Sequence, residues 1–180
     1  MGRDKALLAY RGKTFLNHLI HLALPRVESL VVVLGHNEQL ISESLPSFQR
    51  ISVVVNRDYD RGMLSSLQKG LESTPANADW ILWMLVDHPA VRGRTLDALI
   101  ASTSHTPAPL VIPRFNGDRG HPIMVSRRVA ERMLQLDQSA SPQDVVRSHY
   151  AETRFVDVDD AGVILDVDRP LDYRGLGATG

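Results

Sequence analysis

The hydrophobic positions of this chain fall into short continuous runs, separated by segments in which apolar residues recur every three or four positions. The continuous runs are rich in Val, Ile and Leu, which is typical of strands that are covered on both faces. We expect strands at Leu30–Leu34, Ile51–Val55, Trp80–Val86 and Leu110–Ile112, and weaker ones at Arg154–Val158 and Val163–Asp166.

The segments between these runs predict helices, because their apolar residues share one helical face. Ser141 and Pro142 have the residue types of an N-cap and a first turn, and Pro170 begins a further short helix. The helical segments are Phe15 to Ala23, Leu64–Glu72, Leu96 to Ile100, Val129 to Leu136 and Pro142–Tyr150. Strands alternating with helices are typical of an α/β fold with a mainly parallel sheet. We expect a single domain over residues 1–174 and a flexible tail over 175–180.

Composition narrows the class of protein without identifying it. The chain has 180 residues, which allows one domain with a sizeable core, and its net charge of -1 lacks the basic excess of nucleic-acid-binding proteins. The absence of cysteine excludes disulfides, thiolate metal sites and a cysteine nucleophile. The longest apolar run is far shorter than the roughly 20 residues that cross a bilayer. We therefore expect a cytoplasmic protein without membrane or nucleic-acid partners.

A carboxylate follows the most apolar of the predicted strands. Asp87 comes directly after the run that begins at Trp80, and Pro89 prevents the strand from continuing. Ligands of open α/β sheets bind outside the carboxyl ends of the strands, so Asp87 should project into a binding crevice. The alternative is a turn or N-cap aspartate for the helix that begins near Arg94.

A polar loop between the second strand and the next helix is a second candidate. It runs from Asn56 to Gly62, and the helix opens near Ser65 and Ser66. The N-terminus of a helix that follows a strand favours phosphate groups. The alternative is an ordinary serine N-cap.

A basic loop is a third candidate for a binding site, and a pair of aspartates is a fourth. Asn116-Gly117 predicts a tight hairpin turn. Arg114 precedes this turn, and Arg119 and His121 follow it. These three side chains could face an anionic substrate or simply lie in solvent.

Asp166 and Asp168 share one face of an extended segment. These two carboxylates either complete a metal site begun by Asp87 or cap the helix that begins at Pro170.

Taken in this order, the segments resemble the molybdenum-cofactor nucleotidyltransferases, which are MocA- or MobA-like NTP transferases, and most closely their cytidylyltransferase branch. The matching segments cover nearly the whole chain and comprise residues 2–8, 10–14, 33–36, 62–67, 85–89, 119–122 and 166–170. The resemblance implies a three-layer, Rossmann-like nucleotidyltransferase fold. It also implies an enzyme that transfers CMP from CTP to the molybdopterin of the molybdenum cofactor and releases pyrophosphate.

The same resemblance implies roles for individual residues. Lys5 and Asp87 would be catalytic, with Lys5 neutralising the triphosphate, and Asp87 and Asp168 would bind Mg²⁺. Mg²⁺ prefers hard oxygen ligands and commonly takes one or two carboxylates together with substrate phosphates. The nucleotide would contact Gly2, Arg3, Lys5, Asn56, Gly62, Ser65 and Ser66. The molybdopterin substrate would contact Arg119, Gly120 and His121.

The chain departs from the family pattern at its beginning and at two internal positions. The family starts with a strand and a glycine-rich loop directly before the Met-Gly-x-x-Lys segment, and here that methionine is Met1. We therefore expect the first central strand to be missing, which would expose unpaired strand edges, weaken activity and favour self-association. His88 stands where glutamine is usual, and Arg169 where threonine is usual.

Two alternatives remain open from the sequence. The first is a nucleotidyltransferase of the same fold that uses GTP or another acceptor, since nucleotide selectivity depends on hydrogen bonds to base edges. The second is a non-catalytic protein that binds molybdenum cofactor and delivers it to a molybdenum hydroxylase.

Overall fold

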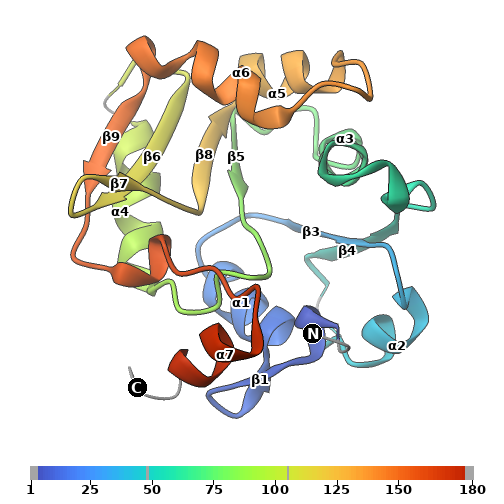
Figure 1. Cartoon of the computed structure of the whole chain (residues 1–180). Coiled ribbons are helices and arrows are strands. Elements are labelled where there is room, and N and C mark those ends of the chain that lie inside the picture. The colour runs from blue at the N-terminus through green and yellow to red at the C-terminus, as the bar shows by residue number, and fades with distance from the viewer. Residues whose placement is uncertain (1–3, 48, 105, 177–180) are drawn as a thin grey trace.

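A computed structural model describes residues 4–47, 49–104 and 106–176 and shows strands flanked by helices (Figure 1). The strands are β1 (Ala9–Tyr10), β2 (Lys13–Thr14), β3 (Leu30–Leu34), β4 (Ile51–Val55), β5 (Trp80–Trp83), β6 (Leu110–Phe115), β7 (Asp118–Arg119), β8 (Ile123–Ser126) and β9 (Arg154–Asp157). β1 and β2 form a hairpin, β3 and β4 form a parallel pair, and the other five strands form one sheet. The α/β, Rossmann-like fold class predicted from the sequence is confirmed.

The larger sheet has the strand order β5-β8-β6-β7, and β9 adds to β6. β8 runs antiparallel to both β5 and β6, while β9 is parallel to β6, so β5, β6 and β9 share one direction. This mixed pairing corrects the expectation of a mainly parallel sheet. The cause is the hairpin turn at Asn116 and Gly117, whose positive φ values of 51° and 90° send the chain back along β6.

Helices pack against these strands through their apolar faces, and all but α2 lie in segments where the sequence predicts a helix. They are α1 (Phe15–Ala23), α2 (Glu38–Glu43), α3 (Met63–Glu72), α4 (Gly93–Thr103), α5 (Arg127–Leu134), α6 (Pro142–Ser148) and α7 (Pro170–Leu176), with short 3₁₀ turns η1 (Lys5–Leu7), η2 (Tyr59–Arg61), η3 (Tyr150–Glu152) and η4 (Ala161–Val163). The largest buried cluster joins Leu110 and Val125 of the sheet to Val129 and Met133 of α5. Each such side chain contributes about 1.5–3 kcal/mol when fully buried.

Several predicted boundaries were wrong. β5 ends at Trp83 rather than Val86, because its partner strand β8 begins opposite it at Ile123. The strand expected at Val163–Asp166 is absent from the described structure, where η4 is followed by irregular chain. In this segment Gly162 lies so close to the backbone of Ala90 that a Cβ atom would be 2.4 Å from it, so the position requires glycine.

The sequence reasoning also missed elements at the edges of the predicted ones. β8 and α2 were not anticipated, since each is short and lacks a strong periodic signal. Gly175 and Leu176, which the sequence placed in a flexible tail, belong to α7, and the side chain of Leu176 is buried. Residues 177–180 lie outside the described residues. Within the described part of the chain, no helix is long and apolar enough to cross a membrane.

The strand ladders of the described residues leave the β3–β4 pair separate from the five-stranded sheet. Figure 1 shows this pair crossing the molecule near the end of β5, with the N-terminal segment close by. The absence of a first central strand stays a prediction. The region where these segments converge contains the residues that the sequence singled out.

Candidate active site

Three residues from distant parts of the sequence meet beyond the end of β5. Lys5, the first residue of η1, extends its ammonium group to Asp87 Oδ2 at 3.3 Å and to Asp168 Oδ1 at 2.5 Å. Asp87 follows β5, and Asp168 precedes α7. The fold thus brings together the lysine and the two carboxylates that the sequence predicted for catalysis and metal binding.

Charge pairing shifts the pKa values within this cluster. Burial lowers the pKa of the Lys5 ammonium, but the hydrogen bond to Asp168 and the charge of Asp87 outweigh that effect, so the pKa is raised above 10.5. The Lys5 hydrogen bond holds the pKa of the Asp168 carboxyl below its ordinary value. Both shifts favour the charged forms, so at neutral pH the Lys5 ammonium is paired with the Asp168 carboxylate.

The segment from Asp160 to Asp168 is held in place at three points. Its buried start, Asp160, accepts hydrogen bonds from the Arg92 N–H and the Thr95 hydroxyl at the beginning of α4. The carbonyl of Val163 then accepts the His121 N–H at 2.8 Å, and the Val167 N–H donates to the Asp87 carbonyl at 2.9 Å. These bonds fix the backbone that carries Asp168 toward Lys5.

The donor set suits a hard divalent cation. Besides the Lys5 contacts, Asp87 Oδ1 is buried without a hydrogen-bond partner among the described residues, so it is free to act as a ligand. Among the described residues, no group of three or more His, Cys, Asp or Glu side chains could hold a metal ion. Two carboxylates fit Mg²⁺ when phosphate oxygens complete the coordination shell.

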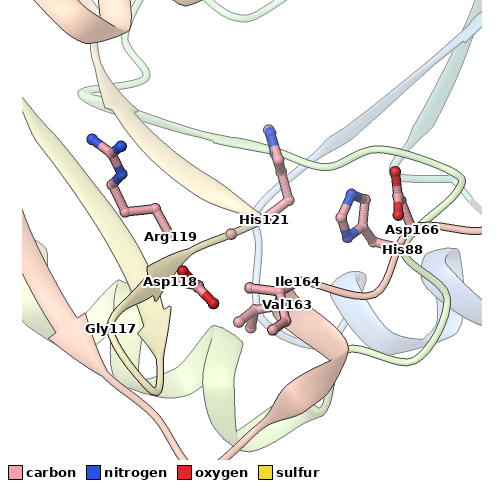
Figure 2. Close-up of a pocket in the computed structure, with 9 residues that line it drawn as sticks. His88, Gly117, Asp118, Arg119, His121, Val163, Ile164 and Asp166 are labelled. Atoms are coloured by element: carbon pink, nitrogen blue, oxygen red, sulfur yellow. The ribbon is translucent and has the colours of Figure 1, made fainter.

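A cavity of about 540 Å³ is lined by His88, the residue that follows Asp87 in the sequence (Figure 2). Its size is within the usual range of small-molecule sites. The lining residues are His88, Gly117, Asp118, Arg119, Gly120, His121, Val163, Ile164 and Asp166. The predicted acceptor residues Arg119, Gly120 and His121 thus line one cavity, on the turn and strand that follow β6.

Gly120 is at this position for a steric reason. A Cβ atom there would lie 2.0 Å from the Val163 carbonyl oxygen, so only glycine lets the hairpin pack against η4. Arg119 places its guanidinium over the Tyr150 ring at 4.3 Å, which keeps the cation at the rim of the cavity. Arg114, by contrast, is engaged with both carboxylate oxygens of Asp157 and does not line the cavity.

His121 is a mostly buried member of the cavity wall. Its ring packs edge-on against Trp83 at 5.6 Å and lies 5.4 Å from the ring of His88. Burial, aided by the neighbouring His88, lowers the pKa of His121 to about 4, although Asp87 and the Trp83 backbone act in the opposite direction. His121 is therefore a neutral imidazole at pH 7.

The predicted nucleotide loop is braced by its own polar groups. Asn56, which is 4% exposed, donates from Nδ2 to the hydroxyls of Ser65 and Ser66 at 2.9 Å. The Ser65 hydroxyl donates a hydrogen bond to the Gly62 carbonyl at 2.8 Å. Gly62 is the residue directly before α3 and has a φ of 102°. A smaller cavity of about 170 Å³ borders Asn56 and Ser65. Nucleotide binding by these residues stays a prediction.

Contacts near the N-terminus connect this loop to the lysine. Asp4, next to Lys5, accepts a hydrogen bond from Asn37 Nδ2 at 2.6 Å and lies 4.0 Å from His36. The His36 ring in turn lies 6.1 Å from that of Tyr59 in the loop. The other predicted nucleotide residues at this end, Gly2 and Arg3, lie outside the described residues.

The sequence reasoning did not assign His88, Asp118 or Asp160 to the site, and Asp166, which it considered as a metal ligand, lines the cavity. His88 could have been recognised from the sequence, because it directly follows Asp87, the aspartate at the end of the predicted strand. Asp160 acts through backbone contacts with residues more than sixty positions away, and no local pattern indicates such a pairing.

In this α/β fold, a lysine and two carboxylates meet beyond the end of a strand, near a cavity. These are groups that a nucleotidyltransferase needs to neutralise phosphates. The family model of the MobA-like NTP transferase domain matches residues 1–153. This chain belongs to that family of nucleotidyltransferases.

Individual relatives are similar over much of the chain. The molybdenum cofactor cytidylyltransferase of Escherichia coli is 25% identical over 175 residues, which cover 96% of this chain and 86% of that protein. A probable molybdenum cofactor guanylyltransferase of Bacillus cereus is 29% identical over 141 residues, which cover 76% and 67%.

Among solved structures, Rv0371c of Mycobacterium tuberculosis is 30% identical and superposes with a TM-score of 0.85 over 98% of this chain and 89% of that one. A second structure of Rv0371c, in complex with manganese, has a TM-score of 0.80.

Proposed function

We propose that this protein transfers CMP from CTP to the molybdopterin of molybdenum cofactor, releasing pyrophosphate with the help of Mg²⁺. The observation that carries this proposal is the contact of Lys5 with both Asp87 and Asp168, close in sequence to His88 and Asp166, which line the 540 Å³ cavity. The product would be the form of the cofactor that a molybdenum hydroxylase receives.

The reaction joins a phosphate oxygen of the acceptor to the α-phosphorus of the nucleotide and breaks the bond to pyrophosphate. Asp87 and Asp168 would hold the cation. When bound, the cation would neutralise the negative charge of the phosphates. Lys5 would leave the carboxylates and pair with the departing pyrophosphate, because an ammonium there stabilises charge that develops in the transition state. Arg119, Gly120 and His121 would hold the acceptor in the cavity. No covalent intermediate with the protein is required.

The choice of CTP rests on a relative rather than on a contact to the base. The E. coli cytidylyltransferase is matched over a larger share of both chains, whereas the Bacillus guanylyltransferase is slightly more identical over a shorter stretch. The second similarity favours GTP as the alternative nucleotide.

The decisive experiment measures pyrophosphate release by the purified protein with molybdopterin-bound molybdenum and either CTP or GTP, with Mg²⁺ or Mn²⁺. We expect release with CTP that depends on both the acceptor and the metal. Faster release with GTP would reassign the nucleotide. Tight binding of the acceptor without release from either nucleotide would favour a non-catalytic accessory protein instead.

A further inference from the structure

Three buried side-chain atoms in or next to the cavity lack hydrogen-bond partners among the described residues. They are Asp87 Oδ1, His88 Nδ1 and His121 Nδ1. Folded proteins rarely leave a buried polar atom without a hydrogen bond unless a ligand, ion or water completes it. The proposed function accounts for Asp87 Oδ1 through the cation and for His121 as a residue that holds the acceptor. It gives His88 Nδ1 no role.

The His88 ring is held in one place. Its side chain is 12% exposed, and its other nitrogen, Nε2, lies 3.9 Å from Asp87 Oδ1, which is too long for a hydrogen bond. The ring of His121 lies 5.4 Å away and is itself packed on Trp83. Figure 2 shows His88 and His121 among the residues that line the same cavity. His88 is thus oriented by packing, with an unused nitrogen.

The position of His88 decides which part of an acceptor it meets. The acceptor phosphate that attacks the α-phosphorus must lie beside Asp87, because Asp87 binds the cation that contacts the nucleotide phosphates. His88 is the next residue and lines the cavity at that end. The body of the acceptor then extends toward Asp118 and Arg119, on the hairpin side of the cavity.

We propose that His88 is an acceptor-binding residue, whose ring N–H donates a hydrogen bond to the phosphate of a pterin phosphate and aims it at the α-phosphorus. The proposal rests on the proposed function and adds a specificity-determining residue to it. His88 exchanges no proton with the acceptor, whose phosphate is already an anionic nucleophile at neutral pH. Its contribution is to position that phosphate and to distinguish it from a hydroxyl group.

Two substitutions separate hydrogen bonding from packing. His88→Phe keeps an aromatic ring against His121 but removes the donor, whereas His88→Gln keeps an N–H donor. We expect H88F to raise the KM for the acceptor roughly 10- to 100-fold, as for loss of a hydrogen bond to a charged group. The KM for CTP should stay within about twofold, and H88Q should recover most of the acceptor affinity.

Calorimetric binding of two probes tests the same contact without turnover. The probes are a 6-alkylpterin phosphate monoester and the corresponding alcohol, with inorganic phosphate as a third ligand. The unaltered protein should bind the monoester more tightly than the alcohol, and H88F should lose that difference while its melting temperature stays near that of the unaltered protein.

An equal loss of affinity for monoester and alcohol in H88F would overturn the proposal, because His88 would then contact the pterin body. Failure of the unaltered protein to prefer the monoester would also overturn it. If the preference is present and depends on His88, but neither CTP nor GTP is consumed, the nucleotidyltransferase function fails while the phosphate contact stands.

Discussion

Lys5 has two conflicting roles at the scale of a single side chain. Without ligands its ammonium neutralises Asp87 and Asp168, and the same two carboxylates are the expected metal ligands. A divalent cation and Lys5 therefore compete for the same oxygens. In the proposed reaction the lysine is needed elsewhere, on the triphosphate.

Lys5→Met should separate these roles. We expect Mn²⁺ to bind roughly tenfold more tightly in the absence of nucleotide, a difference of about 1.4 kcal/mol, because no ammonium competes for the carboxylates. Turnover should fall about 100-fold or more, since the charge of the leaving pyrophosphate loses its partner. Electron paramagnetic resonance of free Mn²⁺ measures the first effect. Lys13→Met, at an exposed position in β2, is the control, and equal Mn²⁺ affinity in the two variants would argue against the competition.

His121 makes the stability of the fold depend on pH. Its pKa is about 4 in the folded protein and 6.5 in an unfolded chain, so the unfolded state binds more protons between these values. The stability linked to His121 is therefore complete above pH 6.5 and is lost as the pH falls toward 4, by roughly 3 kcal/mol. Urea unfolding between pH 4.5 and 7 should show a weaker pH dependence in His121→Asn, and parallel curves for the two proteins would contradict this.

At the scale of an element, the Asp160–Asp168 segment connects the start of α4 with both the cavity and the lysine cluster. Asp160 is 1% exposed. Its carboxylate accepts hydrogen bonds from the backbone N–H groups of Arg92 and Gly162 and from the Thr95 hydroxyl. The segment has little regular secondary structure, so these side-chain contacts take the place of a helix or strand ladder.

Asp160→Ala should destabilise the fold by about 3 kcal/mol or more, because it leaves several buried donors without an acceptor. The neighbouring Asp159, whose side chain is exposed and paired with Arg94, offers a matched control. Asp159→Ala should change the stability by less than about 1 kcal/mol. Urea unfolding at pH 7 compares the two, and equal losses would indicate that Asp160 does not organise the segment.

At the scale of the whole molecule, the site is assembled from segments that no single sheet joins. Asp87 follows β5 of the five-stranded sheet, the loop predicted to bind the nucleotide follows β4, and Lys5 comes from the N-terminal segment. A nucleotide with its metal would contact all of them, so it should stabilise the molecule as a unit.

CTP with Mg²⁺ should therefore raise the free energy of unfolding by about 2.7 kcal/mol at a ligand concentration 100 times Kd. Asp87→Asn should abolish the part of this gain that requires the metal, because the variant lacks a charged ligand for it. Asp79→Asn, at an exposed position before β5, should keep the full gain. Thermal unfolding with and without Mg²⁺ measures both, and a metal-dependent gain that persists in Asp87→Asn would exclude Asp87 as the metal ligand.

Sequence patterns located the chemistry better than they located the edges of the elements. Asp87 was recognisable because a continuous apolar run must be a buried strand, and a carboxylate at the end of such a strand lies where ligands bind. Asp168 was a candidate because it shares one face of an extended segment with Asp166, whereas Lys5 became a candidate only through the order of motifs shared with a family. The length of β5 was overestimated, because hydrophobicity continues to Val86 although the partner strand does not.

The sequence by itself determined the α/β class, most helices and the hairpin at Asn116-Gly117, because these depend on local periodicity and backbone preference. Only the tertiary structure decided that Lys5 lies between Asp87 and Asp168, that β8 enters the sheet antiparallel, and that His88 faces a cavity with an unused ring nitrogen. These features are contacts between residues far apart in the chain. Their energies depend on packing and burial that appear only when the distant segments meet.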